Sequence, residues 1–122
     1  MAKVEIKGKE VDIDIRCVKM VKFFNSIGLD TKYSCEGHKG TINEFYHITF
    51  EDYINDEDIQ NFISKFKNEK GCTSFKGRFM KWTRIVSNEF KSNWIYLARN
   101  KVLANRDYKT FISLEEYKNE ID

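Results

Sequence analysis

The sequence has no proline, only two histidines and three cysteines among its 122 residues. An odd number of cysteines at wide spacing argues against a disulfide framework and favours reduced thiols in a reducing compartment. The chain also lacks a run of about 20 apolar residues, which a membrane-spanning helix requires. Its first ten residues alternate charged and apolar side chains, unlike a secretory signal peptide. We therefore expect a cytoplasmic protein that does not bind a membrane.

The residues that are present are typical of one folded domain. Hydrophobic residues make up 41% of the chain and aromatic residues 15%, enough for a core at this length. The sequence contains no low-complexity segment that would act as a linker. We predict a single domain over residues 1–122.

Charge is segregated along the chain although the net charge is only +2. Residues 44–58 contain six acidic side chains and no Lys or Arg, whereas residues 65–109 contain twelve Lys or Arg and three acidic residues. The basic block favours an anionic partner, either a phosphorylated small molecule, a nucleotide or nucleic acid. The alternative is a solvated surface whose charge the acidic segment balances in the fold.

Hydrophobic periodicity predicts the first half of the fold. Alternating residues predict short strands near residues 4–6 and 11–15, joined through Gly8 as a hairpin. Three- and four-residue spacing predicts a helix from about residue 15 to 27, with Asp14 as its N-cap and Gly28 at its end. Strands are expected at residues 29–34, with Thr31 and Tyr33 on one side, and at residues 44–51.

In the second half, a helix is expected from an Asp56 cap to Gly71, with apolar residues at positions i, i+3, i+4 and i+7. Strands follow at residues 73–86 and 93–99, and a capping-box spacing predicts a short helix over residues 114–121. The order β-α-β-β-α-β-β-α resembles an α+β ferredoxin-like sandwich, in which an antiparallel sheet carries two helices on one face.

The loop after the third predicted strand concentrates reactive side chains. The loop is expected over residues 35–43, and the candidate site residues at its start are Ser34, which ends the strand, and Cys35, Glu36, Gly37 and His38. Cys35 and His38 have the C-x-x-H spacing of a zinc knuckle, and His47 is the only other histidine. A structural zinc site would need a fourth ligand from Cys17, Cys72 or a carboxylate, and there is no second C-x-x-C pair, so we predict no metal. A Cys35 nucleophile with His38 as its base and Glu36 as its orienting group is a further hypothesis, which leaves the catalytic residues undefined.

Ligand binding is the third interpretation of this loop. Gly37 would bring backbone N–H groups close to an anion, and alternation along residues 78–84 places Arg78, Trp82 and Arg84 on one strand face. Guanidinium groups bind phosphate and aromatic rings stack on bases, which suits a nucleotide. The structural alternatives are that Trp82 and Trp94 are core aromatics with arginines extending past them, and that the loop is a plain polar turn.

The segment from Gly28 to His38, followed by a hydrophobic strand, resembles small uncharacterised proteins of phages and low-GC bacteria. The matching pattern is T-x-x-S-C-x-G-H, at Thr31, Ser34, Cys35, Gly37 and His38. It is also distantly similar to the Ser-Cys-Ser-Gly-Arg motif of wybutosine-synthesis methyltransferases, with His38 at the arginine position. That second resemblance implies an RNA substrate and S-adenosylmethionine as cofactor.

Three functions follow from these patterns. We expect a phage-encoded binding protein that holds an anionic nucleotide-like molecule at the SCEGH loop with His47, Arg78, Trp82 and Arg84, and so sequesters a host signal. The first alternative is an inhibitor that binds a host defence protein complex by surface charge. The second is an RNA- or nucleotide-modifying enzyme.

Overall fold

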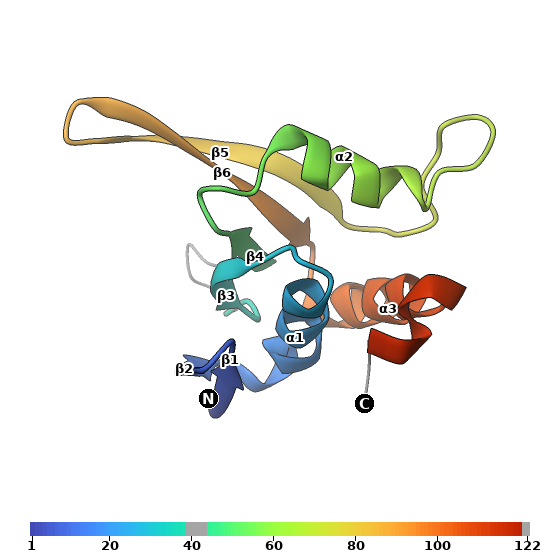
Figure 1. Cartoon of the computed structure of the whole chain (residues 1–122), viewed down its shortest axis with the longest axis horizontal. Helices are drawn as coiled ribbons and strands as arrows, with labels where there is room; N and C mark the ends of the chain where they lie inside the picture. Colours follow the sequence, from blue (N-terminus) through green and yellow to red (C-terminus); the bar gives the residue numbers. More distant parts are fainter. Residues whose placement is uncertain (39–43, 121–122) are drawn as a thin grey trace.

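The computed structural model describes residues 1–38 and 44–120. Its elements run in the following order: β1 (Ala2–Ile6), β2 (Lys9–Ile13), the 3-10 turn η1 (Ile15–Cys17), α1 (Val18–Ser26), β3 (Thr31–Cys35), β4 (Tyr46–Phe50), α2 (Asp56–Ser64), β5 (Arg78–Val86), β6 (Glu89–Ala98), α3 (Lys101–Ile112) and the 3-10 turn η2 (Glu115–Glu120). Figure 1 shows the long β5–β6 hairpin extending away from the two helices α1 and α3.

The α1 helix ends as the sequence predicts, but it begins differently. Gly28 has a φ of 88°, the left-handed conformation that a glycine adopts most easily. Asp14 precedes η1, yet its side chain makes no capping bond to this turn. Its carboxylate accepts instead the backbone N–H of Glu36, so the predicted cap is wrong. Asp14 therefore joins the start of α1 to the loop after β3.

The α2 helix is shorter than predicted and has a different cap. Asn55 and Asp58 form a reciprocal capping box, in which each side chain accepts the other residue's backbone N–H. The helix ends at Ser64, and Gly71 closes a later turn. Asp56 lies one residue inside the helix, where its carboxylate is available to pair with Lys81 at 2.6 Å.

The α3 helix was not predicted at all. Asn100 caps it by accepting the N–H of Leu103. Its buried residues have the i, i+3, i+4, i+7 spacing of one helical face: Ala104, Asp107, Tyr108 and Phe111. The expected helix at residues 114–121 is the short 3-10 turn η2 in the described part of that segment.

The main sheet has four antiparallel strands in the order β3-β4-β6-β5. β5 starts at Arg78, later than predicted, and β6 starts at Glu89, earlier than predicted. Ser87 and Asn88 alone join them, with φ values of 52° and 66°. Two successive positive φ angles are typical of the tight two-residue turn whose twist matches that of the strands. Residues 87–92 are therefore a turn and a strand start, not a connecting loop.

A bulge in β3 reverses the expected face of one residue. Thr31 pairs with Phe50 whereas Tyr33 pairs with Thr49, so the register shifts by one residue between them. Because the shift moves side chains to the opposite face, Thr31 and Tyr33 do not share a side as predicted. Thr31 accepts a hydrogen bond from buried Asn25, while Tyr33 is exposed on the other face.

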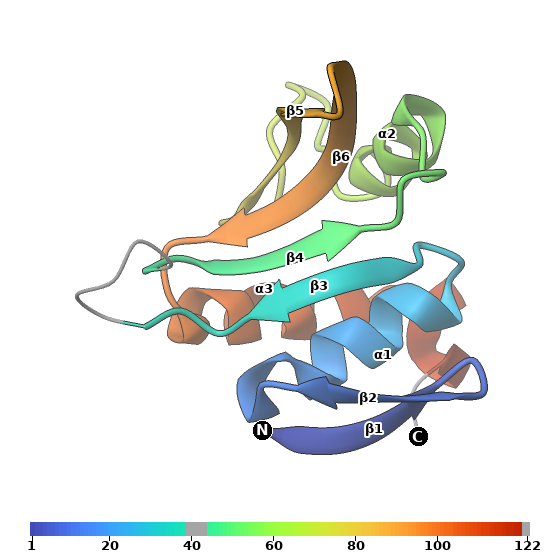
Figure 2. The ribbon, with the colours of Figure 1, turned by 90° about the vertical axis from the view of Figure 1, so that its left-hand side faces the viewer.

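All three helices contribute to one aromatic core on a single face of this sheet. Phe24 of α1, Phe62 of α2 and Phe111 of α3 contact one another with ring centroids 5.1–5.9 Å apart. Phe79 of β5 and Phe50 of β4 face the same core. Figure 2 shows the four strands side by side with α3 behind them. The opposite face of the sheet carries no helix among the described residues.

The fold is α+β with two antiparallel sheets and three helices, which confirms the predicted class. The ferredoxin-like order is not confirmed in detail. β1 and β2 pair with each other as a separate two-stranded sheet, and every neighbouring pair in the main sheet is antiparallel. Within residues 1–38 and 44–120, none of the helices has the length and apolar character needed to cross a membrane.

Candidate functional site

The open face of the main sheet contains a groove of about 360 Å³. Sites for small molecules have volumes of roughly 300–1,000 Å³. The groove is lined by Tyr33, Phe45, His47, Thr49, Trp82, Arg84, Asn93, Ile95 and Leu97. These residues come from β3, β4, β5 and β6 and from the residue just before β4, so the groove crosses all four strands.

Strand register explains why these side chains meet. Tyr33 lies opposite Thr49, Thr49 opposite Ile95, and Trp82 opposite Asn93. Partners in an antiparallel pair point to the same face of a sheet. Ile95 is only 5% exposed yet lies outside the aromatic core cluster, so it forms the floor of the groove.

Two exposed aromatic rings stand at opposite sides of this floor. Tyr33 on β3 is 62% exposed and Trp82 on β5 is 58% exposed. β3 and β5 are the two edges of the sheet, separated by three strand spacings or about 14 Å. Trp82 is therefore a surface residue, whereas Trp94 faces the helices, where its indole N–H donates to Asp56 at 2.8 Å.

Arg84 is the cation of the groove, and buried Asn93 holds it in place. The guanidinium donates to Oδ1 of Asn93, whose amide donates to Phe50 O at 2.9 Å and to Asp52 Oδ1 at 2.6 Å. Lys32 also donates to Asp52, at 3.2 Å. The hydrogen bonds from Asn93 and Lys32 lower the pKa of Asp52. This chain of hydrogen bonds holds one of the five N–H groups of Arg84, whose side chain lines the groove.

His47 supplies the second polar group of the groove. Its Nδ1 lies 3.3 Å from the backbone oxygen of Phe45. Since a carbonyl oxygen only accepts, Nδ1 is the donor in this contact, and Nε2 is the other polar atom of the ring. The groove thus offers a cationic donor and an imidazole between aromatic rings.

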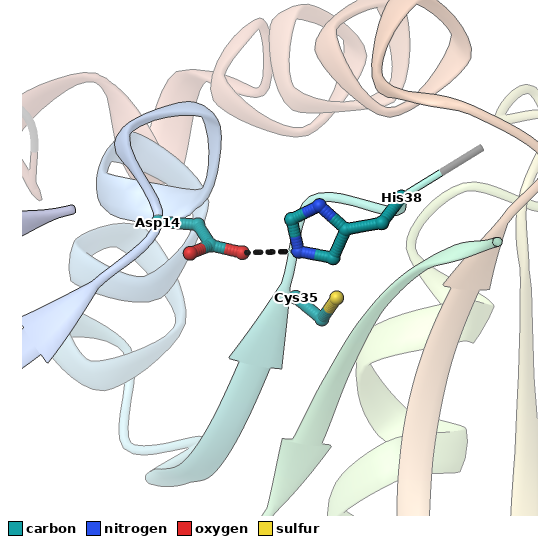
Figure 3. A group of neighbouring side chains, drawn as sticks. All are labelled: Asp14, Cys35 and His38. Atoms are coloured by element: carbon teal, nitrogen blue, oxygen red, sulfur yellow. Dashed lines mark ion pairs between the residues drawn. The ribbon is translucent and has the colours of Figure 1, made fainter. Parts of the chain in front are cut away.

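A separate polar cluster lies at the exit of β3. Figure 3 shows the Asp14 carboxylate directed at a ring nitrogen of His38, with the Cys35 side chain next to the same ring. One donor atom from each residue lies within 4.8 Å of the other two, and Nε2 of His38 is 3.8 Å from Oδ2 of Asp14. Two backbone bonds hold this cluster: Glu36 N–H donates to Asp14 Oδ2 at 3.0 Å, and Gly37 N–H to Cys35 Sγ at 3.4 Å.

A fully buried thiol lies close to this cluster. Burial raises the pKa of Cys17 to about 12, although a hydrogen bond with Tyr46 opposes the shift, and the charges of Asp14 and Glu36 raise it further. Burial likewise raises the pKa of Tyr46, whose hydroxyl donates to Arg16 O at 3.2 Å. Cys17 is therefore a neutral thiol at physiological pH.

The structure divides the predicted site residues between separate places. The groove contains His47, Trp82 and Arg84, whereas Cys35 and His38 belong to the cluster with Asp14. Glu36 and Gly37 contribute backbone N–H groups there. Ser34 lines a different cleft, of about 440 Å³, between the N-terminal hairpin and β3. Arg78 is exposed and lies on the groove side of β5, but outside the groove lining.

Sequence reasoning missed several of the lining residues. Phe45 and Thr49 alternate with His47 along the predicted strand, so that signal was present. Asn93 and Ile95 required the position of β6 and its pairing with β5. Asp14 gave no signal for the cluster, because it lies 22 residues before Glu36, which it contacts.

The basic block is partly neutralised by acidic residues from elsewhere in the chain. Lys81 pairs with Asp56, and Lys65 pairs with Glu116 at 3.0 Å. Both pairs lie away from the groove lining. The anionic partner expected from the charge distribution stays a prediction, and Arg84 is the residue of the basic block that lines the groove.

One comparison with known proteins identifies a family. A family model described as YoqC prophage protein matches residues 2–120. No curated protein and no solved structure matches the chain. The expected relation to phage proteins is confirmed, while the similarity to wybutosine-synthesis methyltransferases stays a prediction. Because the match covers nearly the whole chain, the protein belongs to the YoqC prophage protein family.

Proposed function

We propose that this prophage protein binds an anionic molecule with a flat ring, such as a nucleotide, in the groove on the open face of its sheet. The observation that carries the proposal is the position of Arg84. Its guanidinium is half-buried, is held by Asn93 and lies in one groove with the exposed ring of Trp82. This arrangement places a cation and an aromatic surface side by side in one groove.

Each part of the groove lining suits one part of such a ligand. The fork of Arg84 matches the geometry of a phosphate group, to which it donates two parallel hydrogen bonds. A planar base stacks on Trp82 or Tyr33, each stacked base contributing about 1–3 kcal/mol. His47 adds a hydrogen-bonding group on the central strand β4. Ile95 and Leu97 supply an apolar floor.

Binding without turnover fits this lining better than catalysis. The described lining residues include neither a carboxylate nor a thiol, so the groups suited to proton transfer are the imidazole of His47 and the hydroxyl of Tyr33. In a prophage protein, tight binding of a host signalling nucleotide would lower its free concentration. Sequestration is therefore the role that we propose for the groove.

The test is titration of the purified protein with nucleoside monophosphates, diphosphates and cyclic dinucleotides, followed by calorimetry and tryptophan fluorescence. A Trp94→Phe background leaves Trp82 as the reporter, and we expect stacking to quench its emission. Arg84→Gln should weaken binding of the best ligand by tenfold or more. Arg78→Gln is the matched control, since it removes a charge from the same strand face outside the groove.

Two outcomes would contradict the proposal. One is that no member of the panel binds, and the other is that Arg84→Gln and Arg78→Gln bind equally well. A single-stranded oligonucleotide is titrated in the same way as a further ligand. If it binds with a steep salt dependence while the mononucleotides do not, the groove is a nucleic-acid surface instead.

A second candidate function, binding to a host protein, is favoured by the tip of the β5–β6 hairpin. Ile85 and Phe90 lie opposite each other there and are 68% and 79% exposed. Paired apolar side chains on a projecting hairpin are typical of protein contacts more than of a free surface. In this candidate function the host protein binds the apolar tip of the hairpin, whereas the sequence suggested binding by surface charge.

Its test compares co-purification of host proteins with the parent and with an Ile85→Ser/Phe90→Ser variant. Val102→Ser is the control, because Val102 is an exposed apolar residue on α3. A partner lost only from the hairpin variant supports this candidate. A partner retained by all variants shows that the tip does not carry the interaction.

A further inference from the structure

The cluster of Asp14, Cys35 and His38 combines three of the side chains that bind transition metals. Asp14 follows β2, Cys35 ends β3, and His38 lies three residues further on. Sequence spacing connects Cys35 with His38, but only the fold brings the carboxylate of Asp14 to them. The donor atoms of all three lie within 4.8 Å of one another.

We propose that these three residues bind one zinc-type divalent cation through the Asp14 carboxylate, the Cys35 thiolate and a ring nitrogen of His38. The site is distinct from the groove, and the inference does not depend on the proposed function. It also differs from the sequence-based prediction, which had no metal and considered His47 as the second histidine. His47 lines the groove instead.

The donor set and its spacing suit zinc. Zinc binds Cys sulfur at about 2.3 Å and His nitrogen or carboxylate oxygen at about 2.0–2.2 Å, so tetrahedral ligands lie roughly 3.3–3.6 Å apart. The His38–Asp14 distance of 3.8 Å is already near this value. The donor atoms lie at most 4.8 Å apart, so bringing them to bonding positions requires shifts of no more than roughly 1 Å.

Backbone hydrogen bonds orient two of the three donors before any metal arrives. The N–H of Gly37 donates to the Cys35 sulfur and so fixes the position of this side chain. The N–H of Glu36 holds one oxygen of Asp14. Groups around a metal site commonly fix its ligands in this way, and their loss typically lowers affinity 10–100-fold.

The left-handed turn at Gly37 makes the convergence of Cys35 and His38 possible. Its φ is 89°, and a Cβ at this position would lie 2.6 Å from the backbone oxygen of Glu44. A glycine therefore permits the chain to reverse within the two residues between the thiol and the imidazole. The carboxylates of Asp14 and Glu36 add negative charge to this region, which favours a cation.

A metal site explains the geometry better than a nucleophilic Cys-His pair. In such a pair the carboxylate and the thiol use different ring nitrogens of the histidine. Here one atom from each residue lies within 4.8 Å of both others, so the three donors surround a common point. Figure 3 shows the Asp14 carboxylate and the Cys35 side chain next to the same imidazole ring. Three protein ligands leave a fourth tetrahedral position for water or a substrate atom.

The experiment uses the full chain without a polyhistidine tag, after treatment with a chelator. Zn²⁺ affinity is measured by competition with a chromophoric chelator, and Co²⁺ substitution reports the ligands through its thiolate charge-transfer absorption. We expect one equivalent to bind and Co²⁺ to show the thiolate band. Cys35→Ser should remove the band, and His38→Ala should lower Zn²⁺ affinity by about 100-fold.

Matched controls separate this site from other thiols and imidazoles. Cys72→Ser removes an exposed cysteine and His47→Ala removes the groove histidine, so both should keep parental affinity. The His38 side chain is 57% exposed and Cys35→Ser nearly preserves shape, so both variants should retain the parental circular dichroism spectrum.

The proposal is overturned if Co²⁺ gives no thiolate band, or if Cys35→Ser and His38→Ala bind Zn²⁺ as the parent does. It is also overturned if Cys72→Ser, and not Cys35→Ser, removes the band. Arg84→Gln should leave Zn²⁺ affinity unchanged, and His38→Ala should leave nucleotide binding unchanged. Failure at one site can thus be distinguished from failure at the other.

Discussion

Arg84 on β5 donates a hydrogen bond to the side-chain oxygen of Asn93 on β6, and the Asn93 amide in turn donates to Phe50 and Asp52. Asn93 is 2% exposed and every polar atom of its side chain is used. The bond joins a buried polar residue, which stabilises the sheet, to the cation that faces the groove. Stability and the proposed ligand binding are therefore linked at Asn93.

We expect Asn93→Ala to reduce both properties. Loss of the amide leaves the buried Phe50 carbonyl without this donor, which typically costs about 1–3 kcal/mol of unfolding free energy. Arg84 also loses its anchor, so nucleotide affinity should fall. Urea unfolding and calorimetry measure the two effects. Thr83→Ala, on the opposite face of β5, is the control and should leave affinity unchanged.

A buried carboxylate should contribute more to stability than any surface charge. Asp107 of α3 is 1% exposed and accepts the N–H groups of Lys76 and Gly77 and the hydroxyl of Tyr96, all at 2.6 Å. An amide in its place would direct an N–H₂ group at one of these donors. Because hydrogen bonds to charged groups contribute about 1.5–3 kcal/mol each, we expect Asp107→Asn to lose at least about 3 kcal/mol in urea unfolding.

Asp12→Asn, at an exposed position of β2, is the matched control and should change stability by less than about 0.5 kcal/mol. Equal unfolding free energies for the two variants would show that Asp107 is not a structural anchor.

Asp107 also explains why α3 could not be predicted. The apolar stripe of α2 is uninterrupted, with Ile59 and Phe62 buried, and periodicity identifies it. In α3 a carboxylate occupies one of the four buried positions, so the pattern is incomplete. Its burial depends on donors at residues 76, 77 and 96, which sequence periodicity does not reveal.

The groove, too, could be predicted only in part from the sequence, because it depends on how the strands are arranged in the sheet. Alternation correctly placed Trp82 and Arg84 on one face of their strand. It could not give the strand order, which puts β3 and β5 at opposite edges, nor the bulge that turns Tyr33 to the groove. For this reason Trp82 and Arg84 line a groove with Tyr33 and His47, while residues 34–38 lie outside its lining.

The two glycines at residues 37 and 71 allow steric crowding to be separated from backbone strain. Both have φ near +80 to +90°, but a Cβ on Gly71 meets nothing within 4 Å whereas one on Gly37 would lie 2.6 Å from Glu44 O. Both alanine variants share the conformational cost, and only Gly37→Ala adds a clash. We expect it to be less stable than Gly71→Ala by about 1–3 kcal/mol in thermal or urea unfolding. A smaller loss for Gly37→Ala would contradict the packing of this loop against residues 44–46.

Thiol reactivity should follow burial among the three cysteines. Cys17 is buried with a pKa of about 12, so it is protonated and inaccessible at neutral pH, whereas Cys72 is exposed. We expect iodoacetamide to modify Cys72 readily in the native, chelator-treated protein and Cys17 only after unfolding. Peptide mass spectrometry over time measures the order. Rapid native labelling of Cys17 would show that α1 does not cover it.

Asp30 should make stability depend on pH below the neutral range. Burial alone would raise its pKa, but hydrogen bonds from Lys7 and from Tyr53, at 2.5 Å, outweigh burial and hold the pKa below the ordinary value of 3.8. A carboxylate with a lowered pKa stabilises the fold above its unfolded-state value, and this contribution is lost as pH falls through the folded-state value. We expect the difference in unfolding free energy between the parent and Asp30→Asn to shrink as pH is lowered from 7 to about 3. Tyr53→Phe removes one of the two hydrogen bonds. The difference in unfolding free energy between Tyr53→Phe and Asp30→Asn should therefore depend less on pH than the difference between the parent and Asp30→Asn. A difference between parent and Asp30→Asn that stays constant over this range would show that these contacts do not favour the charged form.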